Sequence, residues 1–375
     1  MDLKQNIKRY IGNIPGWNTR RKIVVIESDD WGSVYMSTKD AFNKLISAGF
    51  DFSKNQYLNN DCLESNADME GLYDVLSQHK DSTGRNPVIT GLNLVANPDF
   101  KKIKDNGFTK YEYESFFKTC NHYDGRNRIP ELYKEGIDKR LFIPAFHGRE
   151  HLNVSRWMRL LQENNKTIKT IFEYQIPYVS SGINGESIPN LRAAFDMDSM
   201  DDLAYLQNVI HTGISEFENM FGFRTHYFVP TNGYFNNTLQ SVLCKEGFHA
   251  IGLQRQQIEP KGDGIYEKHY SWLGKKTPYG LLNIARNCFF EPNSWEHPKN
   301  KDWVNDCLHQ INIAFRCFKP AIIGNHRVNF TGSLNPENRT NGLEKLNSLL
   351  SQIIKRWSNI EFMTSEELIN LMLKK

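Results

Sequence analysis

Residues 22–33 read KIVVIESDDWGS, and this stretch decides the fold that the sequence predicts. An unbroken apolar run from Ile23 to Ile26 is typical of a strand buried on both faces, as parallel sheets require. The run leads into two consecutive carboxylates, Asp29 and Asp30. In folds built on parallel strands, functional side chains gather where the strands end. The stretch therefore predicts a buried first strand with a candidate site at its carboxyl end.

Seven further apolar runs follow along the chain, and helix-like segments separate several of them. These runs cover residues 87–96, 141–146, 225–230, 249–254, 281–287, 320–325 and 360–363. Residues 198–222 carry apolar side chains at helical spacing and end in Gly222, while residues 236–247 open with asparagine and close with Gly247. Alternating strands and helices favour an α/β architecture with a parallel sheet.

No Pro/Gly/Ser-rich linker divides the chain, so the sequence predicts one domain over residues 1–375. We expect a barrel core over about residues 20–332 and a C-terminal strand and helices over 340–375. The polar, irregular segments at 50–86 and 174–197 are expected to be insertions above the barrel mouth, with plain surface loops as the alternative.

Charge and cysteine content exclude several classes of function. The net charge is +3, and the lysines and arginines are interspersed with acids, which argues against a nucleic-acid-binding stripe or a polybasic membrane anchor. Six cysteines occur without a CxxC pair, as expected for reduced thiols. With no signal-like h-region and no apolar run long enough to span a bilayer, the expected location is the cytoplasm. The sequence does not predict the oligomeric state.

Residues 143–154, IPAFHGREHLNV, place His147 and His151 four positions apart. If this pair opens a helix, both rings lie on one face within reach of a single ion. Such pairs also arise by chance on exposed helices, so a partner is needed. Adjacent carboxylates at a buried strand end are costly unless a cation neutralises them, although Asp30 could instead cap a helix. A third strand end, at residues 320–325, carries His326.

Two histidines and one carboxylate form a familiar ligand set for zinc or another divalent metal. The second carboxylate of the Asp29–Asp30 pair would be free to act as a base, and a separate histidine could protonate a leaving group. The constellation therefore predicts metal-assisted hydrolysis.

The order Asp-Asp, His-x-x-x-His, a Pro-Gly loop and a late strand-end histidine resembles the polysaccharide deacetylases, the nodulation-factor deacetylase homology group of carbohydrate esterases. The resemblance covers residues 22 to about 330. It implies a distorted (β/α) barrel of about seven strands and hydrolysis of N- or O-acetyl groups on an oligosaccharide, polysaccharide or glycan precursor. It also implies a divalent ion, with zinc the leading candidate and cobalt, nickel or manganese the alternatives.

The resemblance assigns roles to individual residues. Asp29 would be the general base and His326 the general acid, while the metal ligands would be Asp30, His147 and His151. The loop HYFVPTNGYFN (226–236) is similar to the third motif of the family. The residues predicted to bind substrate are Trp31, Pro230, Asn232, Gly233 and Glu291.

The chain also departs from the family pattern. Val229 stands near the place of the usual arginine of the third motif, and we predict that Arg286 takes over its catalytic role. Glu291 is the candidate to support His326, with Trp295 as a possible groove wall. An ordinary strand-end salt bridge is the open alternative for Arg286 and Glu291. Glu27 and Ser28 replace the usual Thr-Phe before the two acids.

Two other functions remain open from the sequence. A glycoside hydrolase on a related seven-stranded barrel would use Asp29 or Glu27 with a distant acid such as Asp196 or Glu291. A carbohydrate-binding pseudoenzyme would keep the fold without the reaction.

Overall fold

The computed structural model describes residues 3–295 and 301–374. Each of the eight apolar runs contributes a strand to one large parallel sheet, which confirms the α/β class. Its strands pair in the order β10-β7-β6-β5-β2-β1-β12-β11, and β13 pairs with the first half of β1. In this order they are β10 (Leu282–Asn283), β7 (Ala250–Ile251), β6 (Tyr227–Phe228), β5 (Phe142–Gly148), β2 (Ile89–Leu94), β1 (Lys22–Trp31), β12 (Ala321–His326), β11 (Cys288–Phe289) and β13 (Ile360–Met363).

The sheet curls into a distorted (β/α) barrel that stays open. Its edge strands β10 and β11 do not pair with each other among the described residues. Nine strands take part where about seven were expected; β11 adds only a two-residue pairing with β12. Two small antiparallel pairs lie outside this sheet: β3 (Ala96–Pro98) with β4 (Tyr113–Ser115), and β8 (Gln256–Pro260) with β9 (Tyr266–Tyr270).

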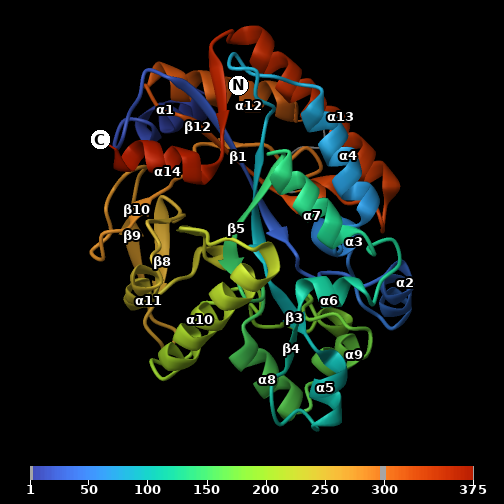
Figure 1. Cartoon of the computed structure of the whole chain (residues 1–375). Helices are drawn as coiled ribbons and strands as arrows, with labels where there is room; N and C mark the ends of the chain where they lie inside the picture. The colour runs from blue at the N-terminus through green and yellow to red at the C-terminus, as the bar shows by residue number, and fades with distance from the viewer. Residues whose placement is uncertain (1–2, 296–300, 375) are drawn as a thin grey trace.

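Helices flank the curled sheet (Figure 1). They are α1 (Leu3–Gly12), α2 (Lys39–Ser47), α3 (Gln56–Asn60), α4 (Asn66–Ser77), α5 (Phe100–Asp105), α6 (Phe116–Cys120), α7 (Ile129–Asp138), α8 (Val154–Gln162), α9 (Lys166–Glu173), α10 (Asp202–Phe221), α11 (Gln240–Lys245), α12 (Trp303–Arg316), α13 (Pro336–Arg356) and α14 (Ser365–Leu373). In Figure 1, α4, α7 and α13 lie on one side of β1 and β5, and α10 lies with the β8–β9 pair on the other. No helix in the described ranges has the length and apolarity needed to cross a bilayer.

Local sequence signals explain where several helices begin and end. The helix expected over 198–222 runs from Asp202 to Phe221 and stops at Gly222, whose φ of 74° suits glycine. The segment 50–86 was expected to be irregular, but it contains α3 and α4. Helix α4 begins at a capping box formed by Ser65 and Asp68 and buries Leu72 and Leu76, so that expectation is corrected.

The parallel register brings the predicted site residues to one end of the sheet. In the pairing of β1 with β12, Asp29 lies opposite His326. Strand β5, which carries His147, is separated from β1 by β2 alone. Ile23, Val24, Val25 and Ile26 are buried beneath this end, as expected for a strand covered on both faces. All six cysteines are free.

Candidate active site

A bulge at the end of β1 turns both aspartates toward one cavity. Strict alternation would aim Asp29 and Asp30 at opposite faces of the sheet. The register with β2 shifts between Ser28 and Trp31, and Asp30 adopts a φ of 74°. Both carboxylates therefore line the same cavity. A non-glycine residue in this left-handed region costs about 1–3 kcal/mol, and such strain is concentrated at functional sites.

Asp30, His147 and His151 bring three possible metal-binding atoms together in a buried setting. The Oδ1 atom of Asp30 lies 3.2 Å from Nε2 of His151 and 3.7 Å from Nε2 of His147. A tetrahedral ion with bonds of about 2.1 Å needs ligand atoms about 3.4 Å apart. One carboxylate oxygen and two imidazole nitrogens at this spacing fit a divalent transition-metal ion.

The local structure around the histidines differs from the expected helix start. His147 is in β5, and His151 lies in the loop before α8. Gly148, with a φ of 136°, turns the chain between them, and the buried Arg149–Glu150 ion pair fixes the turn. The four-residue spacing thus brings the two rings to a centroid distance of 5.7 Å through a loop, which corrects the helical interpretation.

Hydrogen bonds at the far ring nitrogens distinguish the two histidines. Nδ1 of His147 donates to the carbonyl oxygen of Val229 at 2.7 Å, which leaves the Nε2 lone pair free for a metal. Nδ1 of His151 instead lies 3.4 Å from Nε of Arg192, which can only donate. In this geometry the proton of His151 resides on Nε2, and metal binding there requires it to shift to Nδ1.

Arg192 is a site residue that the sequence analysis missed. Its guanidinium donates to Oδ2 of Asp30 at 3.0 Å and lies 4.3 Å from the centre of the Tyr35 ring. Burial alone would raise the pKa of Asp30, but Arg192 and the two histidines hold it well below its usual range. Burial, with Arg192 second, lowers the pKa of His151 to about 4, so this imidazole is neutral near pH 7.

Arg286 contacts Asp29 directly, the residue predicted to be the general base. Its Nη1 and Nη2 atoms donate to both oxygens of Asp29 at 2.6 and 2.5 Å, and its Nε donates to Glu27 at 2.7 Å. Burial opposes ionisation of Asp29, but Arg286 and His326 outweigh it and lower its pKa. Glu27 also accepts hydrogen bonds from Tyr227 and Ser365. Asp29 is therefore held as a carboxylate at neutral pH.

His326 is paired with two carboxylates. Its Nδ1 lies 2.6 Å from Oε1 of Glu291, whose other oxygen accepts a hydrogen bond from Asn329. Its Nε2 lies 3.5 Å from Oδ2 of Asp29. Burial would lower the pKa of His326, but Glu291 and Asp29 raise it to about 10. The imidazole therefore carries a proton at neutral pH, with Nε2 directed toward Asp29.

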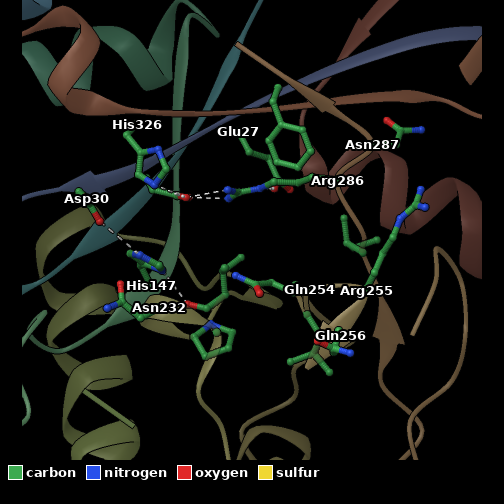
Figure 2. A pocket seen from close by; sticks show the side chains of 18 of the residues that line it. Glu27, Asp30, His147, Asn232, Gln254, Arg255, Gln256, Arg286, Asn287 and His326 are labelled. Atoms are coloured by element: carbon green, nitrogen blue, oxygen red, sulfur yellow. Dashed lines mark hydrogen bonds and ion pairs between the residues drawn. The ribbon is translucent and has the colours of Figure 1, made fainter. Parts of the chain in front are cut away.

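One cavity of about 1230 Å³ is lined by both aspartates, the three histidines and the two arginines described above: Asp29, Asp30, His147, His151, His326, Arg192 and Arg286. Figure 2 shows His326, Asp30 and His147 toward one end of the drawn residues and Arg255 and Asn287 toward the other, with Arg286 between them. Pro230, Asn232 and Gly233, which the sequence predicts to bind substrate, also line this cavity.

Two of the predicted substrate-binding residues are placed differently. Trp31 is fully buried in the core, with its ring 4.9 Å from that of Phe142, so the expectation that it contacts substrate is corrected. The Trp31 ring follows the bulge in β1 and packs into the hydrophobic core. Glu291 holds His326 and is not part of the cavity lining. Trp295 is exposed and likewise lies off that lining.

The distant acids proposed for a glycosidase are bound to other side chains. Asp196 forms a buried ion pair with Arg156 at 2.7 Å and does not line the cavity. Glu291 is bound to His326. The geometry thus offers neither as a proton donor across the cavity from Asp29.

No family model matches the chain, and no curated protein matches it. Among solved structures, it is similar to a putative polysaccharide deacetylase from Mycobacterium smegmatis, with 10% identity over 96% of this chain and 93% of that one and a TM-score of 0.47. It is also similar to a probable polysaccharide deacetylase from Pseudomonas aeruginosa PAO1, with 10% identity over 95% and 92% and a TM-score of 0.48. The chain is also similar to a CE4 family pseudoenzyme from Bacillus anthracis, with 10% identity over 93% of this chain and 66% of that one and a TM-score of 0.35. TM-scores below 0.5 do not indicate a shared activity.

Proposed function

We propose that this protein is a metal-dependent hydrolase that removes acetyl groups from a carbohydrate. One observation carries the proposal. A ligand trio of Asp30, His147 and His151 shares a cavity with a carboxylate and a protonated histidine, each held by its own partner. In this arrangement one set of residues would hold an ion and another would transfer protons, which suits metal-assisted hydrolysis of an amide or ester.

The ion would be held by Asp30, His147 and His151, and when bound it would supply Lewis acidity toward the acyl carbonyl and water. Zinc suits two imidazoles and one carboxylate; cobalt, nickel and manganese are the alternatives.

Asp29 and His326 move the protons in this proposal. Asp29 accepts a proton from the attacking water, while Arg286 keeps it ionised and fixes its orientation. His326 donates the proton on Nε2 to the departing sugar nitrogen or oxygen, as the bond to the acetyl carbon breaks. The products are acetate and the free amine or hydroxyl. Glu291 is the positioning residue that keeps His326 protonated.

The cavity wall supports a sugar as the substrate. Tyr35, Tyr57, Tyr178 and Tyr234 line the cavity, and tyrosine combines an apolar ring with a polar hydroxyl. Tyr57 also meets His326 edge to face, with ring centres 5.8 Å apart. The volume of about 1230 Å³ is above the usual range of about 300–1,000 Å³ for a small-ligand pocket and leaves room for more than one sugar ring.

Acetate release from acetylated oligosaccharides tests the proposal, with the zinc-loaded protein and an enzymatic acetate assay. We expect release by the wild type, and none by the His147→Ala variant. Release of reducing ends without acetate would identify a glycosidase. Sugar binding with neither product would identify a pseudoenzyme and overturn the proposal.

A further inference from the structure

One end of the cavity is lined by cations that belong to neither the ligand trio nor the acid–base pair. Figure 2 shows Arg255 at the opposite end of the drawn residues from His326 and Asp30. Further cations, from α1 and from the residues that precede α12, line the same cavity. We define the cationic end of the cavity by its four residues: Lys8, Arg9, Arg255 and Lys301.

Two of these cations share one carboxylate. Nη2 of Arg9 lies 2.8 Å from Asp306, and Nζ of Lys301 lies 3.1 Å from the same side chain. Three of the four carboxylates that the described residues contribute to the cavity lining are paired with Arg192 or Arg286. Asp306 is the fourth, so the cationic end carries four positive charges against one negative charge.

The other two cations lie along one face of α1 and have no charged partner. The guanidinium of Arg255 lies against Gly12, where an added Cβ atom would be 1.4 Å from its Nη1. Lys8 lies one helical turn before Gly12, on the same face. Both side chains are exposed, and neither forms an ion pair or hydrogen bond that the structure records within residues 3–295 and 301–374. Their charges are therefore available to a ligand in the cavity.

A short path of contacts joins the cationic end to the proposed base. Arg286 holds that base, and the next residue, Asn287, donates a hydrogen bond to Asn13 at 2.9 Å. Asn13 directly follows Gly12, the glycine beside Arg255. All of these residues except Gly12 line the same cavity, so one ligand could reach both the base and the cations.

We propose that the cationic end binds a phosphate group carried by the acetylated carbohydrate. The acetylated sugar in this inference rests on the function proposed above, whereas the phosphate rests on the cationic end. A guanidinium fork can bind two phosphate oxygens, and a lysine adds a point charge. A phosphate monoester carries about 1.5–2 negative charges near neutral pH, which suits this excess of positive charge better than a single carboxylate does.

Calorimetry with the zinc-loaded protein tests the inference. The probes are N-acetylglucosamine and N-acetylglucosamine 1-phosphate, which differ only in the phosphate. We expect the phosphorylated sugar to bind at least about tenfold more tightly to the wild type. The double variant Lys8→Gln and Arg255→Gln should lose most of this gain. It should melt as the wild type does, because neither side chain has a recorded ion pair to lose.

Two controls separate the cationic end from other sources of anion binding. Arg20→Gln with Lys245→Gln changes the net charge equally at exposed positions off the cavity lining, and the gain should persist. His151→Ala removes one member of the ligand trio, and the gain should persist there too, because the phosphate is not bound to the ion.

Four results would overturn the inference. They are no gain in the wild type, a gain that the double variant keeps, a gain that either control loses, and an equal gain from N-acetylmuramic acid, whose anion is a carboxylate. A gain that behaves as expected, without acetate release from any substrate, would refute the proposed hydrolase and leave the phosphate site supported.

Discussion

Arg327 and Arg286 each bind two carboxylates, yet their surroundings differ. Arg327 pairs with Asp61 and Glu64 at 2.9 and 2.7 Å, and all three side chains are 0% exposed. Arg286 pairs with Asp29 and Glu27 at a cavity wall, where its own side chain is 19% exposed. One cluster is sealed in the interior and the other borders a cavity large enough for a ligand.

The pKa shifts of the two aspartates run in opposite directions. At Asp61, burial outweighs Arg327 and raises the pKa to about 6. At Asp29, the two-pronged contact with Arg286, together with His326, outweighs burial and lowers the pKa. An arginine therefore does not by itself lower the pKa of a buried aspartate. The pKa of Asp29 falls because Arg286 contacts both of its oxygens and His326 adds a second positive charge, whereas Asp30 adds a negative charge near Asp61. The open cluster is therefore the better candidate for catalysis.

The largest expected effect is on turnover, in the open cluster. Asp29→Asn removes the proposed base, and we expect acetate release to fall by about 10²–10⁴-fold. Metal content should not change, because Asp29 is not one of the three ligands. Asp61→Asn is the matched change in the sealed cluster and should keep the turnover of the folded enzyme. Full activity in Asp29→Asn would refute the base assignment.

The next effect is on stability, in the sealed cluster. Arg327→Met leaves Asp61 and Glu64 buried without their cation, and we expect the free energy of unfolding to fall by about 3–5 kcal/mol. Urea denaturation measures it. Arg286→Met should cost less, because the cavity admits water to Asp29. Equal losses in the two variants would show that the distinction between sealed and open clusters is wrong.

A smaller effect is expected in metal affinity. Arg192→Gln removes a positive charge beside the ligand trio, and the glutamine oxygen can accept a hydrogen bond from Nδ1 of His151. That bond favours the tautomer with a free Nε2, so we expect zinc to bind about tenfold more tightly in calorimetry. Weaker binding would show that the main contribution of Arg192 is to orient Asp30.

The smallest effect is a shift in pH dependence. His326 must be protonated to act as the acid, and its raised pKa keeps it so up to about pH 10. Glu291→Gln removes the largest contribution that raises this pKa and leaves the burial that lowers it. The alkaline limb of the kcat/KM profile should therefore move to lower pH. An unmoved limb would mean that His326 is not the group that titrates there.

Local patterns in the sequence predicted much of the fold. Unbroken apolar runs predicted the eight strands, because burial on both faces leaves a visible trace in each run. The same runs placed Asp29, Asp30, His147 and His326 at strand ends, and the fold brings those ends together.

The remaining features of the site depend on contacts between distant residues, which local sequence patterns do not predict. Arg192 comes from a segment without periodicity and reaches Asp30 across 162 positions. The helical interpretation of His147 and His151 failed because their spacing fits a glycine turn as well as a helix. Trp31 follows a bulge that the sequence does not reveal.

Bound metal is the measurement that tests the central claim most directly. The protein would be purified without chelator or affinity-tag metal, incubated with zinc, desalted and subjected to elemental analysis, beside the His151→Ala variant. We predict close to one ion per chain in the wild type and a loss of that ion in the variant. No metal in the wild type after zinc addition would contradict the ligand trio and, with it, the proposed hydrolase.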